Sequence, residues 1–281
     1  MSECSHDCSN CSENCGSRAA ESLIAPANAG SRVKKMIAVM SGKGGVGKSM
    51  VTALLATLAQ RNRFQAAVLD ADITGPSIPR MFGVREPVMG GDDGMIPPKT
   101  KTGISLVSVN LLLENETDPV VWRGSLISGT VKQFWTDVVW GDVDYMFVDM
   151  PPGTGDVPLT VFQSLPVDGI IIVASPQELV GMIVEKAVNM ADMMKIPVLG
   201  IIENMSYIAC PDCGRKIYPF GEGRTDRVAK QHGIKVLARI PMDPKLAAAC
   251  DSGLIELADA ACLDDAFKAV EESPKRGGAC G

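Results

Sequence analysis

The chain has no excess of positive charge and no long apolar run. These two absences bear on which kinds of partner it can bind. Its 281 residues carry 27 Lys and Arg against 33 Asp and Glu, a formal net charge of −6. Proteins that bind nucleic acid in bulk usually carry a basic footprint, so we expect no nucleic-acid partner. No stretch reaches the roughly 18 apolar residues that read as a membrane-spanning helix, so we expect no membrane partner.

The first residues also lack the apolar core of a secretory signal, because they are polar and rich in cysteine. Nine cysteines would suit disulfides in a small secreted chain. In a long chain without a signal they indicate metal or redox chemistry, so we expect a cytoplasmic protein. With 46% hydrophobic residues, a chain of this size can bury roughly 75% of its unfolded surface and needs no covalent staples.

A glycine-rich segment between a predicted strand and a predicted helix organises the chain. The apolar run 36–40 predicts a buried strand, and 50–59 predicts a helix. Between them, residues 42–49 match the phosphate-binding pattern GxxxxGK[ST], which assigns Lys48 to the β/γ-phosphates and the Ser49 hydroxyl to Mg²⁺. Glycines let several backbone N–H groups converge on one anion, and the helix N-terminus adds partial positive charge. The residues expected to bind nucleotide here are Gly42, Gly44, Gly45, Val46, Gly47, Lys48, Ser49 and, through its backbone N–H, Met50.

Two further predicted strands end in aspartates. Strand 65–70 leads to Asp70 and Asp72, and strand 145–150 contains Asp149, followed by a turn rich in Pro and Gly. Carboxylates at the carboxyl ends of parallel strands face the nucleotide crevice. We therefore expect Asp149 to hold Mg²⁺ as the acidic residue of a Walker-B pattern. For Asp70 or Asp72 alone, a turn or helix-capping role is the alternative.

The remaining pattern completes an α/β fold, with a mostly parallel sheet flanked by helices on both faces. We expect further strands at 104–109, 169–174 and 198–202, and a last strand with its loop at 235–243. We also expect helices at 125–139 and 179–194 and a long surface loop at 83–103. We divide the chain into a flexible, cysteine-rich segment (1–30), an ATPase domain (31–273) and a disordered tail (274–281).

Two groups of cysteines indicate metal chemistry. The knuckle C-P-x-C-G places Cys210 and Cys213 where both sulfurs can reach one ion, but this is half of a tetrahedral site. Either the two ends of one chain cooperate or two chains each donate a pair, and a redox dithiol is the alternative. Cys250 and Cys262 lie in helical-looking segments, and we expect them to be small buried hydrophobes.

The N-terminal group follows the spacing C-x3-C-x2-C-x3-C. Four thiolates within twelve residues can surround one Fe–S or Zn centre. An unliganded, oxidisable tail is the alternative. The residues concerned are Cys4, Cys8, Cys11 and Cys15.

In combination, these motifs resemble the Mrp/ApbC iron–sulfur cluster carrier ATPases, which belong to the MinD-like P-loop NTPases with a deviant Walker A loop. The resemblance covers about residues 32–260. It rests on the motifs at 42–49, 70–77, 149–156, 203–206, 210–213 and 240–244.

The resemblance implies a P-loop NTPase fold of the SIMIBI type and a homodimer with ATP near its interface. It implies slow, Mg²⁺-dependent ATP hydrolysis and an iron–sulfur cluster, expected to be 4Fe–4S, bridged by Cys210 and Cys213 of both chains. Recipient apoproteins and cluster assembly scaffolds are the implied partners. Lys43 would reach the nucleotide of the partner chain, Asp72 would position water, and Asn204 would lie beside the adenine.

Two other readings stay open from the residues. A positioning ATPase of the MinD or ParA kind uses a basic amphipathic helix or a basic patch, and the C-terminal residues carry neither. A structural dimer stapled by zinc stays possible because Zn and Fe–S centres share thiolate ligands.

Overall fold

The computed structural model describes residues 23–72, 75, 77–112, 124–176, 180–222 and 224–275. The four N-terminal cysteines, residues 276–281 of the predicted tail, and residues 73, 74 and 76 of the second motif lie outside these ranges. Within the predicted N-terminal segment, Ala25 is buried. Its N–H donates to the Ser164 carbonyl oxygen (2.8 Å), and its own carbonyl accepts from Trp135 Nε1 (2.9 Å).

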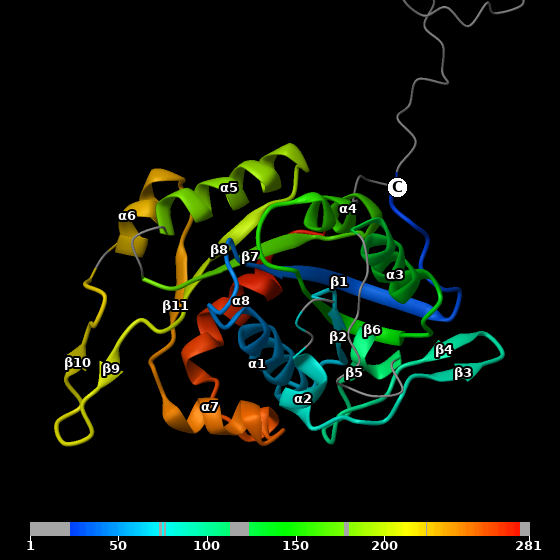
Figure 1. Ribbon diagram of the computed structural model, residues 1–281, viewed down its shortest axis with the longest axis horizontal. Coiled ribbons are helices and arrows are strands. Elements are labelled where there is room, and N and C mark those ends of the chain that lie inside the picture. The colour runs from blue at the N-terminus through cyan, green and yellow to red at the C-terminus, as the bar shows by residue number, and fades with distance from the viewer. Residues whose placement is uncertain are drawn as a thin grey trace, which may run out of the picture.

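A seven-stranded sheet forms the centre of the described chain (Figure 1), and every neighbouring pair in it is parallel. The prediction of a mostly parallel sheet is therefore confirmed. The strand order is β11-β8-β7-β1-β6-β2-β5. The strands are β1 (Ser31–Met40), β2 (Ala66–Asp70), β5 (Ser105–Val107), β6 (Gly141–Asp149), β7 (Gly169–Ala174), β8 (Val198–Glu203) and β11 (Val236–Arg239).

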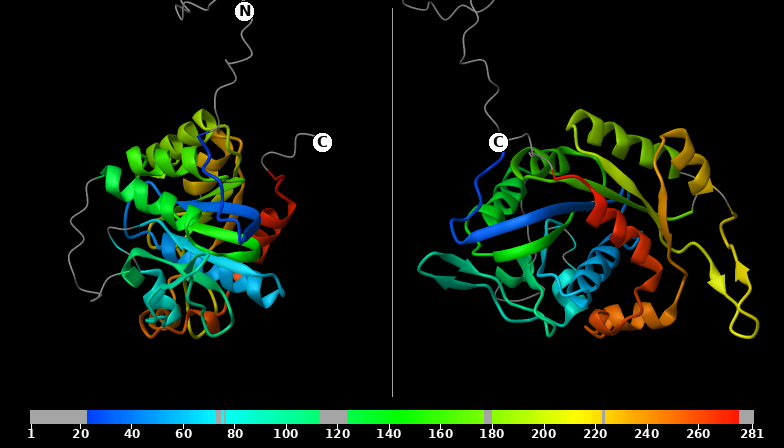
Figure 2. Two further views of the ribbon diagram at one scale, coloured as in Figure 1. Left: turned by 90° about the vertical axis from the view of Figure 1, so that its right-hand side faces the viewer. Right: turned by 180° about the vertical axis from the view of Figure 1, so that it is seen from behind.

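Helices cover both faces of this sheet, as predicted, and Figure 2 shows the two layers from other sides. One core cluster packs the sheet against α3 (Gly124–Thr136), α4 (Asp156–Ser164), α5 (Val180–Met193) and α6 (Arg224–Gln231). The other packs it against α1 (Lys48–Arg61), α2 (Ile78–Phe82) and α8 (Asp264–Glu272), and α7 (Pro244–Asp251) lies on this side. The strands are apolar on both faces because both faces are buried.

The predicted loop 83–103 is wrong in part, because it contains a hairpin of β3 (Met89–Gly91) and β4 (Gly94–Ile96). These strands have three residues each and include three glycines, so they carry too little apolar periodicity to predict. Strand β1 begins at Ser31, five residues before the predicted apolar run. Residues 31–35 are in part exposed and do not form an apolar run, so the apolar run marked only the buried half of the strand. A second hairpin, β9 (Ile208–Ala209) and β10 (Lys216–Ile217), extends away from the body.

The register of the sheet brings the predicted site together. Asp149 at the end of β6 lies opposite Val39 of β1 and Asp70 of β2. Strand β6 is the neighbour of both β1 and β2, so the loop that follows β1 and the acidic ends of β2 and β6 meet at one edge. Among the described helices, none combines the length and apolar character needed to span a membrane.

Candidate functional site

The phosphate-loop segment turns from β1 into α1 through backbone that needs glycine. Gly47 precedes the helix with φ +83°, a left-handed conformation that residues with a Cβ rarely adopt. A Cβ on Gly47 would also lie 2.2 Å from Asn204 Nδ2. That amide donates to the Val46 carbonyl oxygen (2.8 Å), and Asn204 is buried. The residue after β8 therefore holds the phosphate loop through a side-chain hydrogen bond to its backbone.

Asp149 is the centre of the polar contacts in the site. Its carboxylate accepts hydrogen bonds from Lys48 Nζ (2.8 Å) and Ser49 Oγ (2.6 Å). Thr52 Oγ1 also donates to it (3.0 Å). Lys48 Nζ lies 3.4 Å from an Asp72 carboxylate oxygen. The structure thus brings together the predicted Lys48, Ser49, Asp72 and Asp149 from three separate segments.

These charged groups are buried, which changes their proton affinity. Burial raises the pKa of the Asp70 carboxyl well above its usual range, and the charge of Asp149 adds to the rise. Burial also raises the pKa of Asp149, against the opposing effect of Lys48. Burial alone would lower the pKa of the Lys48 ammonium, but the charges of Asp149 and Asp72 outweigh it and raise that pKa. The single positive charge of Lys48 is therefore shared between Asp149 and Asp72.

A cavity of about 380 Å³ lies above the loop. A Cβ added at Gly44, Gly45 or Gly75 would meet nothing within 4 Å, so the backbone there borders open space. Gly153, in the turn after β6, donates its N–H to the Ser41 carbonyl oxygen (2.8 Å) and so joins the two loops. Glycine backbone beside a lysine suits a polyphosphate, and hydroxyl and carboxylate oxygens suit Mg²⁺. The cavity is lined by Ser41, Gly44, Gly45, Gly47, Lys48, Ser49, Met50, Asp72, Gly75, Ser77, Met81 and Pro152.

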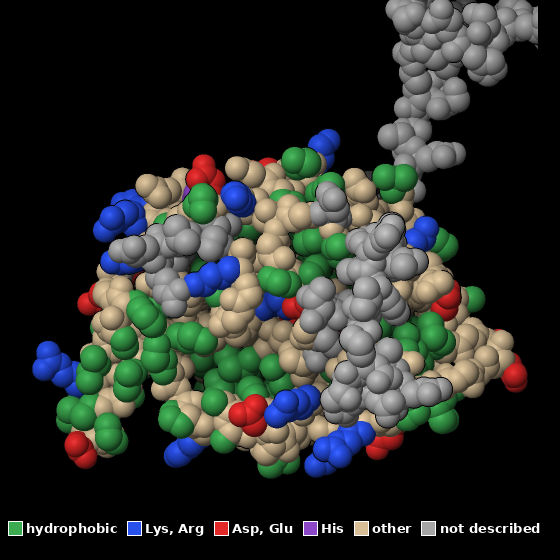
Figure 3. All heavy atoms as spheres, in the orientation of Figure 1, with side chains coloured by type: hydrophobic (Ala, Val, Ile, Leu, Met, Phe, Trp, Pro, Cys, Tyr) green, Lys and Arg blue, Asp and Glu red, His purple; other side chains and the backbone are tan. Residues whose placement is uncertain are grey.

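Next to it lies an apolar hollow of about 450 Å³ between the loop, α7 and the β9–β10 hairpin. Figure 3 shows hydrophobic side chains gathered there. Met50 lines both spaces, and Asn204 lies in the wall of the hollow. A flat base attached to the phosphates could therefore enter it. The hollow is lined by Met50, Asn204, Met205, Ile208, Pro241, Met242, Asp243, Pro244, Leu246 and Ala247.

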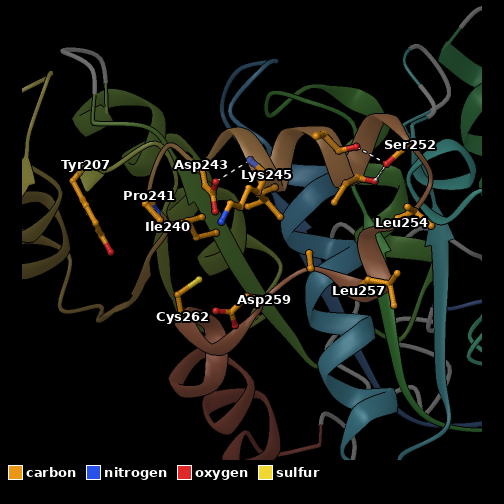
Figure 4. Close-up of a pocket in the computed structure, with 14 residues that line it drawn as sticks. Tyr207, Ile240, Pro241, Asp243, Lys245, Ser252, Leu254, Leu257, Asp259 and Cys262 are labelled. Atoms are coloured by element: carbon orange, nitrogen blue, oxygen red, sulfur yellow. Dashed lines mark hydrogen bonds between the residues drawn. The ribbon is translucent and has the colours of Figure 1, made fainter. Parts of the chain in front are cut away.

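A third cavity, of about 610 Å³, lies beside α7 and contains no residue of the phosphate loop (Figure 4). Cys262 and Asp259 lie in its wall together with Lys245 of α7. Cys262 is exposed and Cys250 is partly exposed, so the prediction that both are buried hydrophobes is wrong. Cys262 lies on a short 3-10 turn (Ala261–Leu263) at the surface, where a helix-like sequence pattern does not imply burial.

The predicted metal knuckle forms the tip of the β9–β10 hairpin. The Cys210 N–H donates to the Arg215 carbonyl oxygen (2.9 Å), and the Gly214 N–H donates to the Cys210 carbonyl oxygen (2.9 Å). Hydrogen bonds from the backbone of Cys213 and Asp212 lower the pKa of the Cys210 thiol, which favours the thiolate that binds metals. Within the described ranges, no three His, Cys, Asp or Glu residues are grouped to hold a metal ion. Among the described residues, the knuckle therefore offers two cysteine ligands.

Sequence reasoning missed two residues of the site. Thr52 lies one helical turn after Lys48, and its single O–H is within reach of both an Asp149 carboxylate oxygen and the Lys48 carbonyl oxygen (3.0 Å each). Ser108, just after β5, donates to Asp70 (2.9 Å). The four-residue spacing in α1 could have indicated Thr52. Lys43 lies in the phosphate loop, where its carbonyl oxygen accepts a hydrogen bond from Ser41 Oγ (3.0 Å). Its contact with the nucleotide of a second chain stays a prediction.

The buried Asp70 carboxyl makes a prediction about pH. Asp70→Asn keeps the shape of the group and removes its ionisation. Because the folded pKa is raised, the stability that wild-type Asp70 contributes is present below about pH 4 and is lost as pH rises through the folded pKa. We expect the free energy of unfolding of the nucleotide-free variant, relative to wild type, to increase as pH rises from about 4 to 8. Urea unfolding measures it.

Asp144→Asn is the matched control with the opposite sign. Hydrogen bonds from Lys34 Nζ (2.6 Å) and the Gln65 N–H (2.8 Å) lower the pKa of Asp144. Its contribution is present above about pH 4 and is lost as pH falls, so this variant should lose stability relative to wild type as pH rises. A pH-independent difference for Asp70→Asn would contradict the account of the buried cluster.

Comparison with known proteins agrees with this geometry. The ParA family profile, described as NUBPL iron-transfer P-loop NTPase, matches residues 32–273. A protein of Methanocaldococcus jannaschii named iron-sulfur cluster carrier protein is 44% identical over 261 residues, covering 90% of each chain. One of the same name from Clostridium perfringens is 44% identical over 232 residues, covering 80% of this chain and 81% of its own.

Solved structures show the same relationship. A nucleotide-binding protein of Archaeoglobus fulgidus in complex with ADP is 45% identical, with a TM-score of 0.72 over 80% of this chain and 88% of its own. The cell division ATPase MinD of Pyrococcus furiosus is 17% identical, with a TM-score of 0.56 over 84% of this chain and 98% of its own, and shares the fold alone. The predicted P-loop NTPase fold is thus confirmed, and the chain belongs to the NUBPL iron-transfer P-loop NTPase family.

Proposed function

We propose that this chain is a slow, Mg²⁺-dependent ATPase that carries an iron–sulfur cluster and passes it to recipient apoproteins in the cytoplasm. The convergence of Lys48, Ser49 and Asp149 at the phosphate cavity carries the nucleotide half of the proposal. The names of the archaeal and bacterial relatives support an iron–sulfur cluster as the cargo. The ADP named for the Archaeoglobus structure supports a nucleotide as the ligand. The same relatives favour a carrier over a positioning ATPase of the MinD kind.

The residues of the cavity fit a nucleotide triphosphate with Mg²⁺. Lys48 would move from its carboxylate partners to the β/γ-phosphates, while Ser49 and Asp149 would hold the metal. Mg²⁺ neutralises phosphate charge when it is bound. Asp72 lies close enough to Lys48 (3.4 Å) to face the same phosphates, and it would orient the attacking water. Asn204 and the apolar hollow would take the adenine.

The cargo would bind at Cys210 and Cys213. A 4Fe–4S cluster or a zinc ion takes about four protein ligands, and the knuckle supplies two. A two-fold axis supplies the other pair without any new residue, because each chain presents the same patch to the other. We therefore propose a homodimer that bridges a 4Fe–4S cluster, loaded by assembly scaffolds, with Lys43 acting on the partner's nucleotide. A second cluster at Cys4, Cys8, Cys11 and Cys15 belongs to the same proposal.

Two substitutions test the nucleotide site. We expect Lys48→Ala to lower ATP turnover at least about 100-fold, because it removes the charge that stabilises the transferred phosphate. It also leaves Asp149 without its ion pair, so its melting temperature should fall. Ser49→Ala keeps that ion pair and should lower turnover through weaker Mg²⁺ binding. Phosphate release at varied Mg²⁺ measures both.

Lys43→Ala tests whether Lys43 promotes ATP hydrolysis in the partner chain or in its own. It should reduce turnover although Lys48 is present, and mixing it with Lys48→Ala chains should restore part of the activity. Turnover equal to wild type in Lys48→Ala would contradict the assignment of the site. A strictly monomeric protein that hydrolyses ATP would contradict the role of Lys43.

A cysteine variant tests the cargo. In the chain whose four N-terminal cysteines are replaced by serine, anaerobically reconstituted Cys210→Ala/Cys213→Ala should lose the ability to transfer a cluster to an apo-ferredoxin. ADP binding should be unchanged, because the knuckle lies outside the phosphate cavity. Cys250→Ala/Cys262→Ala is the control and should transfer normally. Absorbance and iron content measure the result. Zinc alone in protein isolated without oxygen would instead favour a structural dimer.

A further inference from the structure

Helix α7 lies between two hollows, and none of its residues is buried. Leu246 lines both the apolar hollow and the third cavity on the other side of the helix. Its neighbour Ala247 lines the hollow, and Lys245 lines the cavity (Figure 4). Leu246 and Cys250 pack against the core, but both are partly exposed. A helix with so little buried contact belongs to the parts of a fold that open most easily.

The turn after α7 is one of three similar helix ends in the described chain. Gly83 follows α2, Gly233 lies just after α6 and Gly253 lies just after α7, with φ of +67°, +65° and +71°. At each end, the glycine N–H and the N–H of the next residue donate to carbonyl oxygens of the last helical turn. Glycine is favoured in such a cap because a Cβ is costly at positive φ. The backbone conformation alone therefore explains why all three are glycine.

Gly83 and Gly253 differ from Gly233 in what surrounds them. A Cβ on Gly233 would meet nothing within 4 Å. A Cβ on Gly253 would lie 2.7 Å from the Gly83 Cα, and a Cβ on Gly83 would lie 2.9 Å from the Gly253 carbonyl oxygen. The two caps therefore pack backbone against backbone, in a contact that we call the glycine joint. It connects the end of α7 to the end of α2, and the two helices lie side by side in Figure 1.

Helix α2 links the glycine joint to the phosphate cavity. Met81 of this helix lines the cavity, two residues before Gly83. Ile78 and Phe82 are buried, so the helix is held by the core on its other side. A group that fills the phosphate cavity therefore bears on the same short helix that contacts Gly253.

An ion pair also spans the two helices, but it is weak. Arg80 and Asp251 lie 4.0 Å apart, and both side chains are exposed. Exposed pairs of this kind contribute little to stability, because water and salt screen them. The glycine joint is the tighter of these two connections between α2 and α7.

We propose that the glycine joint fixes α7 to α2, which makes Gly83 and Gly253 positioning residues for the nucleotide. Through it, an occupied phosphate cavity holds α7 in place, and α7 forms part of the wall of the apolar hollow. This inference rests on the proposed function in one respect, a nucleotide whose phosphates fill the cavity and whose base enters the hollow. It adds a connection between the two ends of that ligand that passes through the protein.

Cys250 reports the position of α7 without an added label. It packs against the core from α7, is partly exposed and does not line the phosphate cavity. Inorganic tripolyphosphate with Mg²⁺ has no base, so it can fill that cavity and leave the hollow empty. In the full chain, kept reduced and free of iron, we expect saturating tripolyphosphate to slow alkylation of Cys250 by iodoacetamide at least about threefold, because α7 opens less often. Peptide mass spectrometry measures the rate at this cysteine.

Gly253→Ala and Gly83→Ala break the glycine joint, and Gly233→Ala is the matched control. All three place alanine at nearly the same positive φ, but the control directs its Cβ into open space. Both joint variants should lose the protection of Cys250 while they bind tripolyphosphate to within about twofold of wild type, because the phosphate loop is unchanged. They should bind ADP at least about tenfold more weakly, because a displaced α7 misplaces the wall of the hollow. The control should match wild type in all these measurements.

Thermal melting shows which variants are folded. If Gly253→Ala does not fold, Gly83→Ala, whose overlap is smaller, provides the same comparison. The measurement on wild-type protein decides against the glycine joint without any variant. Tripolyphosphate that binds wild type and leaves the Cys250 rate unchanged would overturn the joint while the nucleotide site stands.

The remaining outcomes separate this inference from the proposed function. Protection of Cys250 that persists in a folded joint variant would overturn the glycine joint. An ADP affinity in that variant equal to that of the Gly233→Ala control would overturn it as well. Failure of wild-type protein to bind either ADP or tripolyphosphate would refute the nucleotide site and the joint together.

Discussion

The structure of the site depends on one buried carboxylate, Asp149, and its contact with Lys48. Asp149 ends the strand that lies between β1 and β2, and it accepts hydrogen bonds from Lys48, Ser49 and Thr52. Through these contacts the first turn of α1 is fixed to the carboxyl edge of the sheet. Breaking a buried ion pair by removing one partner costs about 3–5 kcal/mol, because it leaves an uncompensated charge. Lys48 is thus paired with carboxylates of its own chain, and in the proposed function a nucleotide would take their place.

The same edge of the sheet leads into the β9–β10 hairpin that carries Cys210 and Cys213. Strand β8 ends in Glu203, and Asn204 follows it and holds the phosphate loop through the Val46 carbonyl. Met205 then turns the chain with φ +56°, and the Ser206 N–H donates to the Ile240 carbonyl oxygen (2.9 Å). Only a few residues therefore separate the support of the nucleotide loop from the first cysteine. The end of β8 therefore lies beside the phosphate loop and close in sequence to the hairpin that carries Cys210 and Cys213.

Much of this arrangement could be predicted from the sequence, because its signals are local. The strand before Gly42 and the helix after Lys48 follow from apolar runs, and the roles expected of Ser49 and Asp149 follow from motif spacing. The β3–β4 hairpin could not be predicted, since its short, glycine-rich strands have no apolar face. The contacts of the Thr52 and Ser108 hydroxyls depend on tertiary placement and strand register, which a motif does not contain. The exposed Cys262 was mispredicted because a helix-like pattern does not determine burial.

The central claim is that two chains share one cluster on the face that binds nucleotide. Native mass spectrometry of the anaerobically reconstituted protein with Mg²⁺ and ADP tests it most directly, in the chain whose N-terminal cysteines are replaced by serine. The account predicts a species of two chains, one 4Fe–4S cluster and two nucleotides. A cluster retained by a single chain, or a dimer that holds nucleotide and zinc but no iron, would contradict it.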